Sequence, residues 1–180
     1  METDLNKIKK LSEEKEDENW EFRSFLKVCN IPSKKMDSIV HRLYHQAASK
    51  IDCKFCANCC KELDAVLDQD DLIKLSKYLE IPIEQLKDQY LTKDSDLDSR
   101  KFTFKKRPCP LLKNNLCSIP INYRPKDCVS YPYLLKKNFT SRLMGVIGNC
   151  SICPIVFNVY ELLKKEVWHK RFSDDFSDFY

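Results

Sequence analysis

The sequence predicts a mainly α-helical fold with short irregular or minor β segments, in which a single domain of helices surrounds a cysteine-ligated metal core. Three observations lead to this prediction. Apolar residues recur at helical spacing in several segments, glycine occurs only 2 times in 180 residues, and most of the 10 cysteines gather in two groups. So little glycine argues against the phosphate-cradling loops of common nucleotide-binding folds.

The N-terminal part of the chain is predicted to be helical. Residues 1–28 are charged but place apolar residues at helical spacing, which predicts one helix. Ile31-Pro32-Ser33 interrupts this pattern, and Ser33 is a candidate N-cap for the next helix. That helix is predicted over residues 34–51 and leads directly into Cys53.

The middle of the chain mixes short elements. Residues 63–67 alternate apolar and polar side chains, which predicts a short strand or extended segment. Asp68 is suited to cap a helix over 69–79. Pro82 suits the first turn of a further helix that extends to about residue 90. Residues 101–106 are predicted to form a strand with two Phe side chains on one face.

The C-terminal half begins with an irregular segment. Residues 107–132 hold five prolines and three cysteines, and proline prevents long regular structure. Residues 142–147 are predicted to form a strand. Residues 155–172 carry apolar side chains at helical spacing and are predicted to form an amphipathic helix.

We expect no second core and assign the whole chain to one fold. Its parts are an N-terminal helical segment over 1–50 that packs on the core, a cysteine-cluster metal-binding domain over 51–172, and a loose acidic and aromatic tail over 173–180.

Charge and hydropathy narrow the classes of partner. The formal net charge is +4, with 31 basic and 27 acidic residues well mixed, which does not indicate nucleic-acid binding. No window approaches the roughly 20 consecutive apolar residues of a membrane span. The acidic N-terminus has no apolar core segment, so we expect no signal peptide and a cytoplasmic location.

The cysteine spacing indicates a metal. The first group reads Cys-x-x-Cys-x-x-Cys-Cys within eight residues, and cysteines so close together rarely all reach distant disulfide partners. Disulfides also suit secreted proteins rather than this one. Thiolates that converge on one centre are what a soft metal requires. The remaining alternative is that the thiols are simply buried core residues.

Nine cysteines are candidate ligands. They are Cys53, Cys56, Cys59, Cys60, Cys109, Cys117, Cys128, Cys150 and Cys153. Three cysteines at two-residue spacing followed by a remote fourth are typical of a [4Fe–4S] cluster, and two of the remote cysteines precede proline, as fourth iron ligands often do. We therefore favour an iron–sulfur cluster.

Zinc is the alternative metal. A four-thiolate zinc site needs two close pairs, and Cys53/Cys56 with Cys150/Cys153 would provide them. Nine thiols exceed the four of one site, so either two centres exist or some thiols have another role. Cys29 lies outside both groups and is interpreted as an ordinary buried thiol.

A few other side chains are candidates for the site. Arg124 beside metal-bound thiolates would donate hydrogen bonds to sulfur and offset negative charge. Alternatively, Arg124 and the neighbouring tyrosines, including Tyr131, line a substrate pocket, or Arg124 pairs with a surface carboxylate. We take Arg124 and Tyr131 as cofactor-binding candidates. His41 and His45 share a helix face and are interpreted as a partly exposed surface.

The ordered set of motifs resembles a known family. Cys-x-x-Cys-x-x-Cys-Cys, Cys-Pro-Leu-Leu, Cys-Ser-Ile and Arg-Pro-x-x-Cys-x-x-Tyr-Pro, followed by a late cysteine, resemble the YkgJ-type cysteine-cluster family, described as a zinc- or iron-chelating domain. The resemblance covers roughly residues 53–154. It departs at Ala57, where the family tends to have Gly, at Pro120, where Tyr would fall, and at Val129, where Arg often follows the cysteine.

The resemblance implies a metal-binding function and leaves the chemistry open. Because flagellin lysine-N-methylase resembles this family, it implies protein-lysine methyl transfer or redox chemistry, with a protein as substrate or partner. The chain has no Gly-rich S-adenosylmethionine motif, and its spacing differs from the Cys-x-x-x-Cys-x-x-Cys of radical enzymes. The alternatives are a structural zinc-binding interaction module without catalysis, and a metal carrier or sensor.

Overall fold

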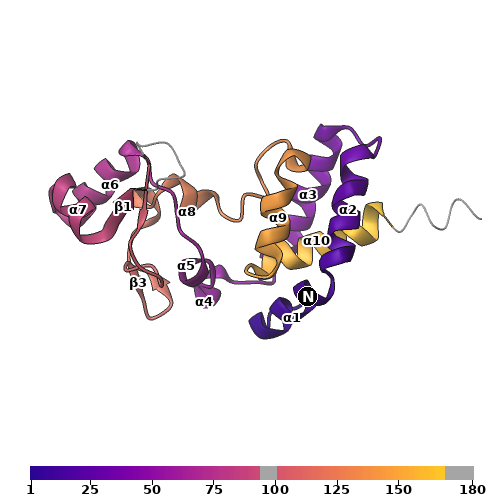
Figure 1. Ribbon diagram of the computed structural model, residues 1–180, viewed down its shortest axis with the longest axis horizontal. Coiled ribbons are helices and arrows are strands. Elements are labelled where there is room, and N and C mark those ends of the chain that lie inside the picture. The colour runs from indigo at the N-terminus through magenta and orange to yellow at the C-terminus, as the bar shows by residue number, and fades with distance from the viewer. Residues whose placement is uncertain (94–100, 169–180) are drawn as a thin grey trace, which may run out of the picture. The chain divides into compact units, whose positions relative to one another are not determined.

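The computed structural model describes residues 1–93 and 101–168 and is mainly α-helical, as predicted (Figure 1). The chain divides into two compact units. Unit 1 comprises residues 1–52 and 132–180, and unit 2 comprises residues 53–131. The predicted tail over 173–180 lies outside the described residues, and the predicted domain boundaries stay a prediction.

Unit 1 is built of helices. They are α1 (Leu5–Glu14), α2 (Glu16–Val28), α3 (Ser33–Ala48), the 3-10 helix η2 (Phe139–Arg142), α9 (Leu143–Cys150) and α10 (Pro154–Val167). Helix α10 packs against α1, α3 and α9. Every residue from Pro154 to Tyr160 is buried, and a helix that is buried on all sides belongs inside a core.

Two sequence predictions in unit 1 are wrong. The predicted single helix over 1–28 is two helices, because the chain leaves helical geometry at Lys15, between α1 and α2. The predicted strand over 142–147 is helix α9. Its buried residues Leu143, Val146 and Cys150 recur at helical rather than alternating spacing, and α9 packs against α10.

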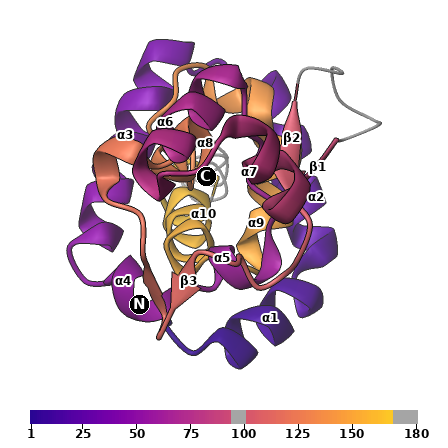
Figure 2. The same cartoon turned by 90° about the vertical axis from the view of Figure 1, so that its left-hand side faces the viewer.

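Unit 2 consists of shorter elements. They are α4 (Cys53–Cys56), α5 (Cys59–Glu62), α6 (Gln69–Leu79), α7 (Ile83–Tyr90), β1 (Leu91–Lys93), β2 (Phe102–Phe104), β3 (Leu112–Lys113), β4 (Leu116–Cys117), the 3-10 helix η1 (Ile121–Tyr123) and α8 (Lys126–Ser130). Within this unit, α6 and α7 lie at one end, whereas α4, α5 and β3 gather at the other (Figures 1 and 2).

Unit 2 has an apolar core of its own, so the expectation that the chain has no second core is wrong. Its buried members are Leu67, Leu72, Leu75, Leu86, Leu91, Phe102, Phe104, Leu111 and Ile119. Strands β1 and β2 pair antiparallel with Leu91 opposite Phe104, and Leu67 forms an isolated bridge with Phe102. This agrees with the predicted extended segment over 63–67 and the predicted strand over 101–106. The core anchors the segments that follow Cys60 and precede Cys109.

No helix in the described ranges is long and apolar enough to cross a membrane.

Candidate metal centre

The nine candidate thiols are divided between the two units. Seven lie in unit 2, whereas Cys150 and Cys153 lie in unit 1. Cys150 ends α9, is 2% exposed and donates a hydrogen bond from Sγ to the Val146 carbonyl at 3.4 Å. Cys153 is the N-cap of α10, with Pro154 in the first turn, so this Cys-Pro pair marks a helix start. No disulfide joins cysteines of the described residues.

The first cysteine group folds as two single-turn helices joined by a left-handed residue. Ala57 connects α4 to α5 with φ of 48° and is buried. This conformation is strained for a residue with a Cβ, and glycine would adopt it without that cost. The turn separates Cys53 and Cys56 from the vicinal pair Cys59 and Cys60.

Cys60 has a thiol that is unusually acidic. A hydrogen bond from Cys59 lowers the pKa of Cys60 to about 7, against the opposing effect of burial. The positive charges of Arg124 and Lys61 contribute to the same lowering. A thiol with such a pKa is substantially thiolate at neutral pH, the form that binds metals.

Cys109 is held directly beside Cys60. Its backbone N–H donates to the Cys60 carbonyl at 2.8 Å. The segments on either side are also joined, because the Arg107 guanidinium forms two hydrogen bonds with the Asp64 carboxylate, one of them Nε to Oδ1 at 2.8 Å. Cys109 therefore meets the first cysteine group at Cys60, although the two residues are far apart in sequence.

Cys117 reaches the same region through a tight hairpin. Strands β3 and β4 place Leu112 opposite Cys117. The two connecting residues, Asn114 and Asn115, have φ of 50° and 62°. Positive φ at both central positions is the geometry of a type I′ turn, which asparagine tolerates well. Helix α4 packs against β4, so the first cysteine group also lies near Cys117.

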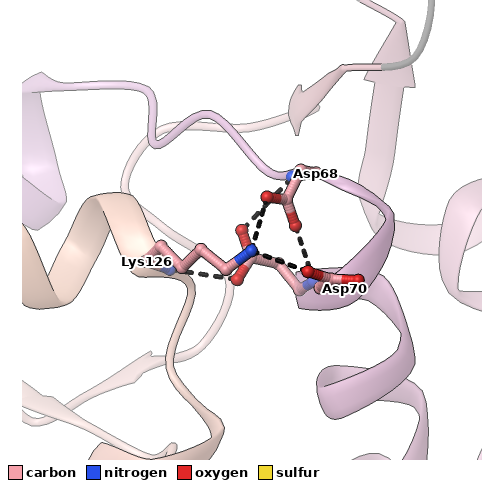
Figure 3. A network of polar contacts seen from close by, with 4 residues as sticks. Asp68, Asp70 and Lys126 are labelled. Carbon is pink, nitrogen blue, oxygen red and sulfur yellow. Dashed lines mark hydrogen bonds and ion pairs between the residues drawn. The ribbon is translucent and has the colours of Figure 1, made fainter.

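Cys128 lies on α8, a five-residue helix that carboxylate hydrogen bonds attach to the rest of unit 2. The Asp71 carboxylate accepts the Lys126 backbone N–H at 3.0 Å, and Asp127 on α8 accepts the Val66 N–H at 3.0 Å. The Lys126 ammonium lies between Asp68 and Asp70, at 2.8 Å from each (Figure 3).

The four thiols of Cys60, Cys109, Cys117 and Cys128 influence one another electrostatically. Burial raises the pKa of Cys109, and the charges of Cys60 and Cys117 add to this effect. Burial raises the pKa of Cys128 to about 12, followed by the charges of Cys109, Cys60, Asp127 and Cys117. Cys128 is exposed as a residue, yet its thiol is surrounded by enough protein for burial to dominate.

These thiols suit a soft metal cation. Neighbouring thiolates repel one another, and a bound cation would remove that repulsion and deprotonate the ligands. In residues 1–93 and 101–168, no three His, Cys, Asp or Glu side chains form a group that could hold a metal ion as they stand. The four thiols are thus neighbours without a closed coordination shell, and their chemistry fits zinc or iron.

The two predicted cofactor-binding residues, Arg124 and Tyr131, form different hydrogen bonds: the Arg124 side chain donates one, and the Tyr131 backbone donates the other. Arg124 donates from Nε to the Ile119 carbonyl at 2.7 Å, and its charge acts on the Cys60 thiol. Tyr131 follows α8, and its backbone N–H donates to the Asp127 carbonyl at 3.1 Å.

Two further predictions concern unit 1. His41 and His45 both lie on α3, and the buried Nε2 of His41 has no hydrogen-bond partner within the part of the chain that the structure describes. Cys29 is half-buried at the end of α2.

Sequence reasoning missed the carboxylates that hold α8. Asp71 is recognisable in the sequence as the N3 residue of a capping box whose N-cap is Asp68. Its hydrogen bond to Lys126, however, joins residues 55 positions apart. The Asn114-Asn115 pair between short apolar runs is a hairpin signal that could have been read from the sequence.

Comparison with known proteins gives the family. Residues 52–146 match the family CxxCxxCC, described as "Putative zinc- or iron-chelating domain". The chain belongs to this family. The match covers more than half of the chain and includes all seven cysteines of unit 2, and it ends before Cys150 and Cys153. The family description supports metal binding, by zinc or iron. No curated protein and no solved structure matches the chain.

Proposed function

We propose that unit 2 binds an iron–sulfur cluster through the thiolates of Cys60, Cys109, Cys117 and Cys128. The proposal is supported by the backbone hydrogen bond that joins Cys109 to Cys60, and by the charges of Cys60, Cys109 and Cys117, which act on the Cys128 thiol.

The other cysteines of unit 2 stay candidate ligands. Cys59 contacts Cys60, and α4 carries Cys53 and Cys56 next to β4. Their Cys-x-x-Cys-x-x-Cys spacing favours an iron–sulfur cluster, of the [4Fe–4S] type, over zinc if these three cysteines supply ligands beside the four thiols named above. Arg124 would offset part of the negative charge of a thiolate-bound cluster, because it already acts on the Cys60 thiol.

A structural zinc site is the second candidate. Four thiolates satisfy tetrahedral zinc completely, and the short elements around them are of the kind that structural zinc stabilises. Under this alternative, unit 2 is an interaction module without catalysis.

Anaerobic purification followed by absorption spectroscopy and metal analysis distinguishes the two. A cluster gives a brown protein with broad absorption at about 400 nm and about four irons and four sulfides per chain. A colourless protein with stoichiometric zinc would overturn the cluster and support the second candidate.

A matched pair of variants tests the ligand assignment. Cys128→Ser in unit 2 is expected to lose metal, because serine is a poor ligand for a soft metal. Cys150→Ser in unit 1 removes a thiol outside the proposed set and is expected to keep the wild-type metal content. Equal retention by both variants would show that Cys128 is not a ligand.

Protein-lysine methyl transfer and redox chemistry, which the family resemblance implies, extend the proposal to catalysis. The metal-loaded protein would be assayed with a methyl donor and lysine-containing protein substrates, and separately titrated through oxidation and reduction. Activity that depends on the metal supports the catalytic role, whereas a loaded protein inert in both assays favours the structural role.

A further inference from the structure

Helix α8 is too short to be stable by itself and has no side-chain cap of its own. It has five residues, and its N-cap, Pro125, makes no side-chain hydrogen bond to the helix. Isolated helices of this length do not form in water, because the entropy lost in ordering the first turn exceeds the free energy gained from its few hydrogen bonds. The orientation of Cys128 on this helix must therefore come from contacts with the rest of unit 2.

The buried carboxylate of Asp71 supplies the missing cap. Asp71 is only 1% exposed and accepts two backbone N–H groups, one on each oxygen. Oδ1 accepts from Lys126 at the start of α8 at 3.0 Å, and Oδ2 accepts from Asp68 at the start of α6 at 3.2 Å. One carboxylate thus joins the N-termini of two helices.

The surrounding ion pairs are exposed and of a different kind. The Asp70 side chain is 70% exposed and contacts the ammonium end of the Lys126 side chain, at 2.8 Å (Figure 3). Exposed ion pairs of this type stabilise little. Asp71, in contrast, holds the backbone of the helix that carries Cys128.

We propose that Asp71 is a positioning residue of the metal site, which orients α8 so that the Cys128 thiol faces Cys60, Cys109 and Cys117. The inference rests on the proposed function, because it assumes that Cys128 is a ligand. Asp71 is not among the proposed ligands and acts on Cys128 through α8. The hydrogen bond from the Val66 N–H to the Asp127 carboxylate is another attachment of the same helix.

Asp71→Asn tests the inference from the acceptor side. Asparagine has one acceptor oxygen in place of two, so either the Asp68 or the Lys126 N–H loses its partner. Loss of partners that orient ligands costs about 10- to 100-fold in metal affinity, and we expect a loss in this range. Asp70→Asn is the matched control, one residue away, and is expected to keep the wild-type affinity within about twofold.

Lys126→Pro tests the same bond from the donor side and leaves Asp71 intact, in case Asp71→Asn fails to fold. Proline lacks the N–H and is well tolerated at the first position of a helix. Lys126→Gln is its control, because it removes the ion pairs and keeps the N–H. Lys126→Pro is expected to weaken metal binding and Lys126→Gln is not.

The readouts are metal affinity by chelator competition and alkylation of each thiol in the metal-loaded protein, located by mass spectrometry. A positioning role predicts rapid alkylation of Cys128 while Cys60, Cys109 and Cys117 stay protected. The inference would be overturned if Asp71→Asn and Lys126→Pro bound metal as tightly as their controls. It would also be overturned if all four thiols became exposed together, because that result indicates a role of Asp71 in the fold alone. A wild-type protein that binds no metal would instead overturn the proposed function, and the inference with it.

Discussion

Units 1 and 2 differ in what holds them together. In unit 1, long helices bury large apolar side chains around α10, whose first two turns are enclosed on all sides. In unit 2, the smaller apolar core has Cys109 and Cys117 packed against it, and hydrogen bonds from carboxylates attach helix α8, which carries Cys128. One chain therefore combines a part stabilised by burial with a part arranged for ligand binding.

Among the tests of this difference, metal removal has the largest expected effect. A structural metal contributes about 10–16 kcal/mol of apparent binding free energy in small zinc domains. Treatment with a chelator should therefore increase amide exchange in α5, β3, β4 and α8, and leave α3 and α10 protected. Hydrogen exchange with mass spectrometry measures this. Equal loss of protection in both units would contradict the comparison.

A cavity in unit 1 should lower the stability of the fold and leave metal binding by unit 2 unchanged. Leu163 on α10 is fully buried, so Leu163→Ala is expected to lower the free energy of unfolding by about 2–5 kcal/mol. Because Leu163 lies in unit 1, metal affinity should stay at the wild-type value. Denaturant unfolding of this variant gives the free energy of unfolding, and chelator competition gives the metal affinity. A large loss of metal affinity would show that the two units are energetically coupled.

Acid should weaken unit 1 through Glu161. Burial acts to raise the pKa of this carboxyl, but hydrogen bonds from Lys15 and Lys164 outweigh it, and the pKa lies below its ordinary value. A lowered pKa in the folded state adds stability above the unfolded value of about 4.3, and this stability is lost as the pH falls through the folded pKa.

The matching measurement is the free energy of unfolding of wild type and Glu161→Gln between neutral and acidic pH. Wild type should be more stable at neutral pH, and the difference should shrink as the pH falls. A difference that stays constant would show that Glu161 is not responsible.

The smallest expected effect concerns Ala57 in unit 2. Its φ of 48° costs an L-residue about 1–2 kcal/mol, and glycine avoids this cost. Part of the gain is offset by the lost methyl and by the flexibility of glycine when unfolded. Ala57→Gly should therefore stabilise the metal-loaded protein by about 1 kcal/mol or less, measured as slower loss of metal to a chelator. Faster loss would mean that the buried methyl matters more than the backbone strain.

The helical elements with clear periodicity were predictable from local sequence. The helix that leads to Cys53 and the capped helix after Asp68 are present, with ends that differ by at most a few residues. The helix predicted over 155–172 is α10, and residues 169–172 lie outside the described residues. Local spacing was insufficient at α9, where a short apolar run with two glycines suits either a strand or a helix until its packing partner is known.

The composition and spacing of the cysteines were sufficient by themselves to indicate a metal of the zinc or iron class, because clustered thiols at two-residue spacing are ligands that need no tertiary context to recognise. Only the tertiary structure decided which thiols are neighbours. It separates Cys150 and Cys153 into unit 1 and brings Cys109, Cys117 and Cys128 towards Cys60. The physical reason is that this proximity depends on bonds such as that between Asp71 and Lys126, which join residues distant in sequence and leave no periodic signal.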